Sequence, residues 1–490
     1  MIRSLLIANR GEIAVRVART ALEMGIEPVG VYAEADAGAF HVGRMARAVS
    51  LGPGTPLETY LSIPRILEAA REARADALHP GYGFLSESAA FARAVEKAGL
   101  TWVGPPAAAM DQMGDKLSAR RRARKAGLPI VPGSEKPDAD DAAIAKKAAE
   151  IGYPVIVKPS AGGGGKGMTL VEKAAALPAA LEEARHLAQA AFGDSRVYLE
   201  KFLVRPRHIE YQVFGDQQGN VVHLYERECS VQRRHQKIVE ETPSYALDTR
   251  LRNAMGRAAV EVSRAVGYVG AGTVEFLLDD RRNFYFLEMN TRLQVEHPIT
   301  EETLGLDLVR AQLEVAAGAA LPSAWQDGRL LPQGHAIELR LYAEDPATFL
   351  PRAGRVLAFE LPSGPGVRVD AGVEEGSSVG LDYDPLLAKL VVSAPDRGSC
   401  IARAHRALED WVVLGVETNK ALLSAVIDSE EFVSGNYATD FVPRLTLASP
   451  RIPDAAWIAA ALSFSDSKDG AVPVSLREPW DAATRWRAGQ

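Results

Sequence analysis

The most informative stretch of the sequence is FYFLEMNTRLQVE, residues 284–296. Apolar and polar side chains alternate along it, and the side chains of a β-strand alternate between its two faces. If the chain stays extended, one face carries the polar set Glu288, Asn290, Arg292, Gln294 and Glu296. That set would span about 26 Å at roughly 3.3 Å per residue. The stretch therefore predicts a strand with one polar face.

A second strand is expected directly upstream, at residues 272–278, and the polar run 279–283 is typical of a turn between the two. Such a hairpin would bring Glu275 and Glu288 close together. Two carboxylates together with the amide oxygen of Asn290 suit Mg²⁺, a hard ion that takes oxygen ligands and often bridges to phosphates. The hairpin thus predicts a candidate metal site.

The remaining polar residues of this face indicate anion chemistry. Arg292 can hold a carboxylate or a carbonate in a bidentate fork. Glu296 can act as a general base if its pKa is suitably placed. A half-exposed strand with a solvated face fits the same alternation equally well, so the pattern leaves both interpretations open. The order of residue types along the face favours a functional site over a solvated face.

The run SAGGGGKG at residues 160–167 is the most unusual local feature. Four consecutive glycines leave backbone N–H groups unshielded and can adopt positive φ, so such a loop can wrap phosphate oxygens. Lys158, at the end of the predicted strand 154–158, would add positive charge beside it. A Walker A loop needs Ser or Thr after Gly-Lys, and here Gly167 follows. A phosphate lid and a flexible hairpin tip both fit the run.

Strands and helices alternate at the start of the chain. Residues 4–8 favour a buried strand, 13–24 a helix and 28–32 the next strand. This order implies a parallel sheet with right-handed crossovers. Two Ala-rich helices around a hairpin are expected at about 140–200, and antiparallel strands dominate from about 204 to 446.

Composition narrows the class of protein. At about 150 residues per domain, 490 residues suggest roughly three domains. The balance of 56 Lys and Arg against 63 Asp and Glu gives a net charge of −7, which argues against a general nucleic-acid binder. The two cysteines, Cys229 and Cys400, cannot build a disulfide framework. No apolar run is long enough for a membrane span or a secretory signal, so we expect a soluble, cytoplasmic protein without a membrane partner.

Three basic features have plain interpretations when each is taken alone. The run QRRHQK at 232–237 lacks aromatic interleaving, so in this acidic chain a small-anion or nucleotide site fits better than nucleic acid. The run RRRARK at 120–125 is more often a solvated helix face. Arg340 would most simply be a surface charge on a strand.

Together these segments resemble biotin carboxylase, the ATP-grasp component of biotin-dependent carboxylases, from about residue 1 to 446. The pieces occur in family order: IANRGEIA (7–14), HPGYGFLSE (79–87), MGDK (113–116), the glycine run, QRRHQK (232–237) and EMNTRLQVEHP (288–298). The resemblance implies an α/β fold of ATP-grasp architecture. Its expected parts are a doubly wound domain (1–113), a helical linker (114–131), a glycine-rich lid domain (132–203), a C-terminal ATP-grasp and biotin carboxylase C-terminal domain (204–446), and a tail (447–490).

The implied activity is the ATP- and bicarbonate-dependent carboxylation of biotin through carboxyphosphate. The positions that match nucleotide-binding residues are Lys116, Lys158, Gly164, Gly165, Glu200, Lys201, Phe202, Leu203, His208, Gln232, His235, Glu275 and Glu288. The matching ligands for Mg²⁺, or Mn²⁺, are Glu275, Glu288 and Asn290. The matching bicarbonate site is formed by Lys237, Arg292, Gln294 and the backbone of Val295.

The resemblance also assigns the chemical steps. Glu296 matches the base that deprotonates bicarbonate, and Arg340 matches the residue that stabilises the biotin enolate. Tyr82 lies near the expected biotin site. The implied catalytic set is Glu296, Arg292, Lys237 and Arg340.

The absence of a biotinylation motif indicates which partner proteins the chain would need. The biotinylation motif Met-Lys-Met is absent and the last methionine is Met289, so we expect biotin on a separate biotin carboxyl carrier protein or domain. A carboxyltransferase subunit of an acyl-CoA carboxylase would then use the carboxylated biotin. Arg16, Arg19 and Glu23 match the dimer helix of the family, whereas Pro365 stands where some members place a phenylalanine. A homodimer or larger assembly is the expectation.

Two alternatives remain open on the sequence. Another ATP-grasp ligase, joining a carboxylate to an amine or thiol, would keep the lid and the metal ligands. It would not need Arg292, Gln294, Glu296 and Arg340. A non-catalytic scaffold subunit would retain the fold alone.

Overall fold

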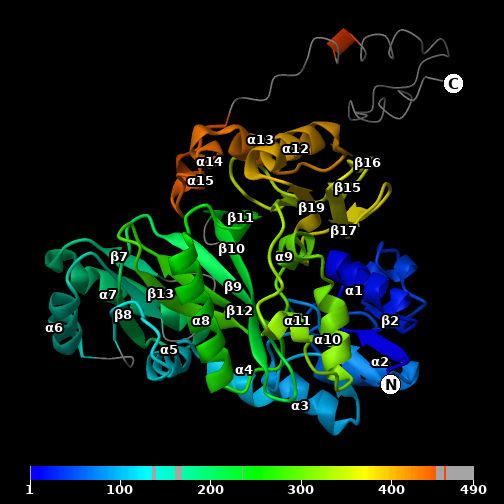
Figure 1. Ribbon diagram of the computed structural model, residues 1–490, viewed down its shortest axis with the longest axis horizontal. Coiled ribbons are helices and arrows are strands. Elements are labelled where there is room, and N and C mark those ends of the chain that lie inside the picture. The colour runs from blue at the N-terminus through cyan, green and yellow to red at the C-terminus, as the bar shows by residue number, and fades with distance from the viewer. Residues whose placement is uncertain (1, 135–139, 160–167, 234–235, 448–456, 459–490) are drawn as a thin grey trace.

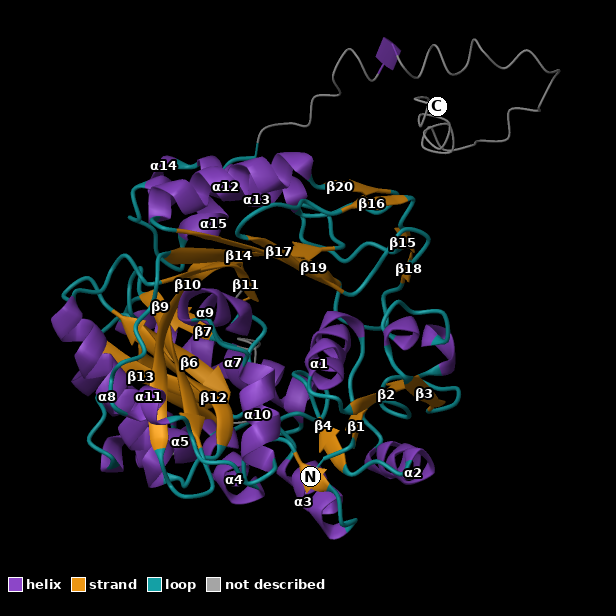
Figure 2. Cartoon of the chain, turned by 45° about the vertical axis from the view of Figure 1, so that its right-hand side comes forward, coloured by secondary structure: helices purple, strands orange, loops and turns teal. Residues whose placement is uncertain are grey.

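The computed structural model describes residues 2–134, 140–159, 168–233, 236–447 and 457–458. Within these ranges the strands form five sheets, which Figure 1 and Figure 2 show from two sides. A parallel sheet near the N-terminus and a large antiparallel sheet lie next to each other, and helices cover both. The mixed α/β architecture confirms the predicted fold class.

The N-terminal sheet is parallel, with strand order β3-β2-β1-β4-β5. Its strands are β1 (Ser4–Ile7), β2 (Glu27–Tyr32), β3 (Arg47–Ser50), β4 (Ala77–His79) and β5 (Thr101–Trp102). The helices of this region are α1 (Gly11–Glu23), α2 (Ile63–Ala73), α3 (Ala89–Lys97) and α4 (Ala107–Gly114), with 3₁₀ turns at Glu34–Asp36 and Val42–Arg44. The order reverses between β1 and β4, which is where open α/β sheets bind ligands.

The loops that follow β1 and β4 are joined at this switch point. The Asn9 side-chain amide donates to the carbonyl oxygens of Pro80, at 2.7 Å, and Tyr82, at 2.8 Å. Gly81 has φ of +63°, and a Cβ there would lie 2.8 Å from Nδ2 of Asn9. Glycine at this position therefore permits the contact that fixes the loop 80–87.

The lid region forms its own small unit. Its antiparallel sheet contains β6 (Val155–Pro159), β7 (Thr169–Val171) and β8 (Val197–Lys201). Helices α6 (Asp141–Ile151) and α7 (Leu177–Phe192) pack on it, with a 3₁₀ turn at Ala174–Ala176, and share a separate hydrophobic core. Helix α5 (Lys116–Lys125) precedes the unit. The glycine run 160–167 lies outside the described residues.

The large sheet is antiparallel throughout. In spatial order its strands are β13 (Phe284–Asn290), β12 (Gly270–Leu278), β9 (Arg207–Gly215), β10 (Val221–Arg233), β11 (Gln236–Thr242), β14 (His335–Tyr342), β19 (Leu386–Ala394) and β17 (Val367–Ala371). Short ladders join β15 (Gly354–Arg355) to β18 (Ser378–Val379) and β16 (Ala358–Glu360) to β20 (Val412–Leu414).

Helices cover this sheet and attach it to the N-terminal part. They are α8 (Thr249–Ala265), α9 (His297–Leu304), α10 (Leu308–Ala316), α11 (Ser323–Gln326), α12 (Arg397–Asp410), α13 (Lys420–Asp428), α14 (Glu430–Val433) and α15 (Phe441–Arg444). One hydrophobic cluster contains Ile13 of α1, Phe214 of β9 and Leu308 of α10. The two sheets therefore share a core, which holds the switch-point loops in a fixed position against the large sheet.

The predicted 26 Å strand over residues 288–296 is wrong beyond Asn290. Strand β13 ends at Asn290, and residues 291–296 form an irregular turn that leads into α9. Pro298 lies in the first turn of α9, where its fixed φ favours a helix start. The chain must therefore leave the sheet before His297. Arg292, Gln294 and Glu296 lie in a turn and do not continue the polar face of the strand.

Candidate active site

A row of charged residues crosses four strands of the large sheet. The strand register places Glu288 opposite Glu275, Glu275 opposite Glu210, and Glu210 opposite Arg227. The hairpin predicted from the turn at 279–283 is present, and it brings the two predicted metal ligands Glu275 and Glu288 together as expected. The register of the strands thus places these charged residues next to one another.

Lys237 is the centre of the site. Its Nζ atom on β11 lies 2.5 Å from Glu210 Oε2, 2.9 Å from Glu275 Oε1 and 2.6 Å from Glu296 Oε1. Burial alone would lower the pKa of Lys237, but the three carboxylates raise it well above its ordinary value. The lysine is therefore protonated, and it contacts one carboxylate each from β9, β12 and the turn before α9.

Glu296 is completely buried between two cations. Its second oxygen, Oε2, accepts from Nη2 of Arg340 at 2.8 Å, and the same nitrogen forms an ion pair with Glu240. Burial would raise the pKa of Glu296, but Lys237 and Arg340 hold it well below its ordinary value. Arg340 is buried in this cluster and is not the surface charge that its isolated sequence context suggests.

The carboxylates Glu275 and Glu288 fit a divalent cation. Burial and the neighbouring Glu275 charge raise the pKa of Glu288, while Lys116 Nζ lies 3.9 Å from its Oε2. Burial opposes ionisation of Glu275, but Lys237 and His208 lower its pKa. Asn290 donates its amide N–H to Glu275 Oε1 at 2.8 Å, and its amide oxygen Oδ1 accepts from Arg292 at 3.2 Å. Two adjacent carboxylates and an amide oxygen form a donor set that Mg²⁺ prefers.

The predicted bicarbonate residues lie in the turn after β13. Arg292 donates to Gln294 Oε1 at 3.0 Å and to Asn290 Oδ1 at 3.2 Å. Its Nε lies 3.4 Å from Glu87 Oε2, and the N–H of Thr291 also donates to Glu87. Glu87 belongs to the switch-point loop of the N-terminal sheet. The turn that carries the predicted anion-binding groups is therefore attached to both sheets.

Tyr82 lies in the same switch-point loop as Glu87. Its ring lies 5.8 Å from Nζ of Lys389, a buried lysine on β19. The Tyr82 hydroxyl has no hydrogen-bond partner among the residues that the structure describes. This predicted biotin-site residue thus lies near β19, the strand that pairs with the Arg340 strand β14.

The predicted nucleotide residues are divided between two places. His208 Nε2 lies 2.9 Å from Glu275 Oε2, and Gln232 approaches the other ring nitrogen at 3.5 Å, so both adjoin the charged row. Burial lowers the pKa of His208, but Glu275 raises it above its ordinary value. Lys201 donates to the carbonyls of Gly152 and Tyr153, both at 2.9 Å.

The other nucleotide positions surround the lid unit. Lys158 pairs with Glu200, whose other oxygen accepts from Arg120 at 2.5 Å. The prediction of a solvated face for the basic run at 120–125 is therefore wrong for Arg120, because an ion pair holds it inside. Lys201, Phe202 and Leu203 line a cavity of about 950 Å³. Gly164, Gly165 and His235 lie outside the described residues.

Sequence reasoning assigned no role in the site to several residues of the cluster, among them Glu210, which in isolation suggests an exposed charge at a strand end but is buried. They are Glu210 and Arg227 in the charged row, and Glu240, Glu338 and Lys389 beside Arg340. The period-2 alternation of His208, Glu210 and Gln212 along β9 is a signal that could have found Glu210. Glu240 and Glu338 carry no such signal, because only the pairing of β11 with β14 brings them opposite each other.

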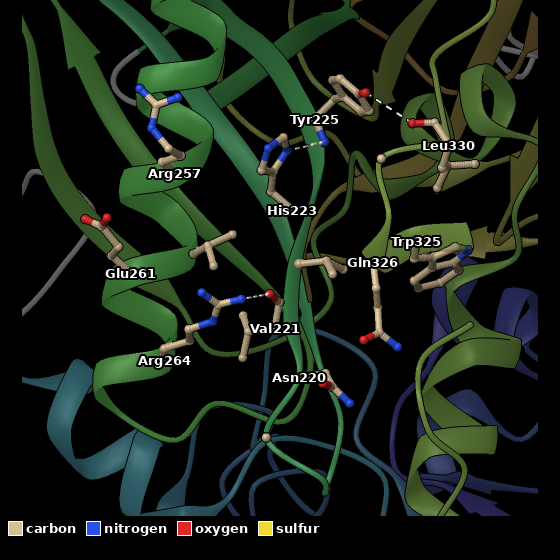
Figure 3. A pocket seen from close by; sticks show the side chains of 14 residues that line it. Asn220, Val221, His223, Tyr225, Arg257, Glu261, Arg264, Trp325, Gln326 and Leu330 are labelled. Carbon is tan, nitrogen blue, oxygen red and sulfur yellow. Dashed lines mark hydrogen bonds between the residues drawn. The ribbon is translucent and has the colours of Figure 1, made fainter. Parts of the chain in front are cut away.

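A separate pocket is lined by the first part of β10, by α8 and by residues 325–330. Figure 3 shows Arg257, Glu261 and Arg264 on α8, His223 on the neighbouring strand β10, and Trp325 beyond that strand. Its volume is about 580 Å³, and none of the predicted site residues lines it. The predicted site residues therefore lie elsewhere, several of them in or beside the charged row.

Among the described residues, no helix combines the length and the apolar character that a membrane span requires.

Three family models match successive parts of the chain. They are described as biotin carboxylase, N-terminal domain (residues 1–110), carbamoyl-phosphate synthase L chain, ATP binding domain (residues 115–324), and biotin carboxylase C-terminal domain (residues 338–444). Together they cover most of the chain.

Curated relatives agree. The biotin carboxylase of Halalkalibacterium halodurans is 48% identical over 442 residues, which cover 90% of this chain and 97% of that protein. Methylcrotonoyl-CoA carboxylase subunit alpha, mitochondrial, of Mus musculus is 46% identical over 445 residues, which cover 90% of this chain and 62% of that protein. The chain thus matches one relative over nearly its whole length and the other over part.

Solved structures show the same likeness. The biotin carboxylase of Campylobacter jejuni, in a β,γ-ATP complex, has a TM-score of 0.87 at 44% identity, covering 91% of this chain and 99% of that chain. The biotin carboxylase domain of Hydrogenobacter thermophilus 2-oxoglutarate carboxylase, in complex with MgADP, ADP and bicarbonate, has a TM-score of 0.86 at 42% identity, covering 90% and 97%. With the sequence matches, these findings confirm the predicted resemblance: the chain belongs to the biotin carboxylase family and is a ligase of ATP-grasp architecture.

Proposed function

We propose that the chain carboxylates biotin on a separate biotin carboxyl carrier protein, using ATP and bicarbonate, as part of an acyl-CoA carboxylase. The observation that carries this proposal is the arrangement around Glu296. Its two oxygens face Lys237 and Arg340, while Lys237 also contacts Glu275 of the acidic pair. A base, two anion-binding cations and a candidate metal site therefore share one small volume.

Glu275, Glu288 and Asn290 are the residues that would hold Mg²⁺ or Mn²⁺. When bound, the ion would neutralise charge on the phosphates of ATP. Lys116, Lys158, His208, Gln232 and the segment 200–203 would hold the nucleotide, together with the glycine run and His235. Their placement at the lid unit and at the edge of the charged row supports this assignment.

Arg292, Lys237, Gln294 and the Val295 N–H would hold bicarbonate, and Glu296 would take its proton. A bicarbonate oxygen then attacks the γ-phosphorus of ATP, the bond to ADP breaks, and carboxyphosphate forms. Catalysis of such a transfer rests on positioning and charge neutralisation more than on covalent chemistry. The cations that keep Glu296 ionised also weaken it as a base, so bicarbonate must displace part of these contacts before the proton moves.

Carboxyphosphate would break down to CO₂ and phosphate beside Arg340. The phosphate takes the proton from the ureido nitrogen of biotin, and the resulting enolate attacks CO₂ through nitrogen. Arg340 would stabilise the enolate oxygen, because a fixed cation acts strongly where negative charge develops in a buried site. Tyr82 would lie beside the biotin ring.

The partners are a biotin carboxyl carrier protein or domain, which supplies biotin, and a carboxyltransferase subunit. For a homodimer, Arg19 and Glu23 remain the candidate contacts on α1. Arg16 is instead buried within the chain, 2.7 Å from Glu301 and 2.9 Å from Asp307. The division of the chain at 113, 131, 203 and 446 and the cytoplasmic location also stay proposals.

The test is ADP release from MgATP by the purified chain, with and without bicarbonate and free biotin. We expect release that needs bicarbonate and rises with biotin. A protein that binds ATP but shows no biotin response, even with a purified biotinylated carrier domain, would contradict the proposal. Bicarbonate-independent release with an amine or thiol acceptor would favour another ATP-grasp ligase, and no turnover at all would favour a scaffold.

A further inference from the structure

Two buried side chains hold the backbone of the turn that carries Glu296. Nδ1 of His297 lies 2.7 Å from the carbonyl oxygen of Gln294. Nζ of Lys389 donates to the carbonyl oxygen of Val295 at 2.8 Å. Both side chains are fully inaccessible to solvent, with 0% of each exposed. The backbone N–H of His297 also donates to the Gln294 carbonyl, at the longer distance of 3.4 Å. Side-chain donors thus hold two consecutive peptide groups.

The direction of a carbonyl decides the direction of the next N–H. A trans peptide is planar, so its C=O and N–H point opposite ways. The cis bonds of the described chain precede Pro154 and Pro243, so the 294–295 and 295–296 peptides are both trans. His297 therefore turns the Val295 N–H away from itself. Within the described ranges no protein acceptor takes that N–H, which leaves it available to an anion.

His297 can act only as a neutral donor here. Burial and the nearby Lys389 and Arg16 charges lower its pKa well below the ordinary value. In the neutral ring the nitrogen that faces a carbonyl must carry the hydrogen, so Nδ1 is the donor. Nε2 is then an acceptor, and it has no hydrogen-bond partner among the described residues.

Lys389 connects the turn to the first helix of the chain. Its Nζ lies 3.3 Å from Glu12 Oε2 on α1, in the segment RGEIA that the proposed mechanism does not otherwise use. On β19, Lys389 is the register partner of Arg340 on β14. The same lysine thus lies between the N-terminal helix, the turn and the strand of the proposed biotin-site arginine.

We propose that His297 and Lys389 are positioning residues that fix the 294–295 and 295–296 peptide groups, so that the Val295 N–H faces bicarbonate and Glu296 stays between its two cations. The inference rests on the proposed function and deepens it. Neither side chain contacts the reacting atoms, and both act through the backbone of the turn.

The His297 test compares His297→Asn with His297→Leu. The Asn side-chain N–H₂ can replace the Nδ1 donor, whereas Leu is close in size and apolar but cannot donate. We expect His297→Leu to raise KM for bicarbonate about tenfold, the effect of one lost hydrogen bond. His297→Asn should stay within about threefold of the wild type, and KM for ATP should not change in either. If the role were packing alone, Leu would do as well as Asn or better in this buried site, and that result would overturn the inference.

The Lys389 test uses the double variant K389M/E12Q, because Met alone would leave Glu12 buried without a cation. We expect an increase of about tenfold in KM for bicarbonate, with nucleotide binding retained. The matched control is Arg65→Met. Arg65 also donates to backbone carbonyls, those of Leu51 at 2.6 Å and Pro53 at 2.8 Å, but contacts no proposed site residue. It should leave both KM values unchanged.

Measurements on the wild type distinguish failure of the proposed function from failure of the positioning role. If its ADP release does not depend on bicarbonate, the proposed function falls. If that dependence is present and the bicarbonate KM is unchanged in His297→Leu, the positioning role falls while the function stands. Loss of the folded state in K389M/E12Q would leave the Asn and Leu pair at 297 to decide.

Discussion

Glu296 shows how one position can set both the charge and the reactivity of a carboxylate. Lys237 and Arg340 each contact one of its oxygens, and together they keep the buried group ionised. An ionised carboxylate can accept a proton, but contacts of this kind make the acceptance unfavourable until they loosen. If Glu296 is the base, binding of bicarbonate would itself activate it by loosening these contacts.

Substituting Glu296 with Gln tests this role directly. The amide keeps the shape but cannot take a proton, so bicarbonate-dependent ADP release should fall by about 100-fold or more, the scale of general-base contributions. ATP affinity, measured by equilibrium binding, should remain near the wild-type value because Glu296 does not belong to the proposed nucleotide site. Full activity in this variant would contradict the assignment and favour a scaffold or another ligase.

The acidic pair predicts a specific metal dependence. Glu288→Gln removes one of the two facing carboxylates, so the Mg²⁺ concentration for half-maximal ADP release should rise by about tenfold or more. A magnesium titration at fixed ATP measures this. The exposed Glu96 on α3 provides the matched control, since Glu96→Gln removes an equal charge far from the row. An equal shift in both variants would argue against a metal site at Glu288.

At the residue scale, local spacing predicted some contacts and could not reach others. The turn at 279–283 sets the register of two neighbouring strands, so the pairing of Glu275 with Glu288 follows from nearby sequence. The burial of Arg340 does not, because Glu240 and Glu296 come from distant segments that approach it only in the folded sheet. A single arginine within an alternating strand pattern does not indicate that distant carboxylates will pair with it.

Among the elements, Arg227 on β10 is the main connection at the centre of the large sheet. It is fully buried and donates to Glu210 and Gln212 of β9, to Thr273 of β12, and to Thr300 of α9. These bonds join β10 to three other elements, so the arginine fixes how α9 lies on the strands. Because α9 begins directly after Glu296, this packing also sets the position of the proposed base.

Arg227→Met should therefore destabilise the protein strongly. It leaves the buried Glu210 without one of its two cations, and breaking a buried pair in this way costs about 3–5 kcal/mol. Guanidinium unfolding, followed by circular dichroism, should show the lower midpoint. Arg93→Ala, which removes an exposed pair with Asp111, should leave the midpoint unchanged. Equal midpoints for the two variants would contradict the central role of Arg227.

Element boundaries show where sequence reasoning reached its limit. The alternation of residues 284–296 predicted one continuous strand, and only its first half is present. Pro298 lies in the first turn of a helix that the period-2 pattern cannot reveal, and the Gln294 carbonyl, which accepts from His297, lies in the turn before that helix. The helix start overrides the alternation because the fixed φ of proline favours the first helical turn and the chain must leave the strand before it.

For the whole molecule, buried neutral histidines predict a dependence of stability on pH. Burial lowers the pKa of His79 to about 4, and its Nδ1 accepts from the Gly81 N–H. The unfolded chain binds the proton near pH 6.5, so the stability tied to neutral His79 is complete above that pH. It is lost as the pH falls from about 6.5 to about 4.

The variant His79→Gln isolates this contribution from groups that act oppositely. Burial raises the pKa of Glu12 and Glu240 to about 7, so their protonation stabilises the folded state over the same range. The free energy of unfolding of the wild type minus that of the variant should fall by up to about 1.4 kcal/mol per pH unit below pH 6.5. Denaturant titrations at several pH values measure it, and a difference independent of pH would refute the prediction.

The large sheet crosses a boundary that the family models suggest. The ATP-binding match ends at residue 324 and the C-terminal match begins at 338. Yet β11 on one side pairs directly with β14 on the other, from Val239 opposite Leu339 to Thr242 opposite Ala336. Both parts also supply residues to the cluster around Glu296.

That pairing limits how the gene can be cut and recombined. A fragment that stopped at residue 324 would expose the backbone edge of β11, and a free edge is a template for joining another chain. The freed segment would tend to self-associate instead of remaining a working nucleotide-binding module. Exchange of this region between proteins would therefore succeed only where the recipient supplies a strand to replace β14.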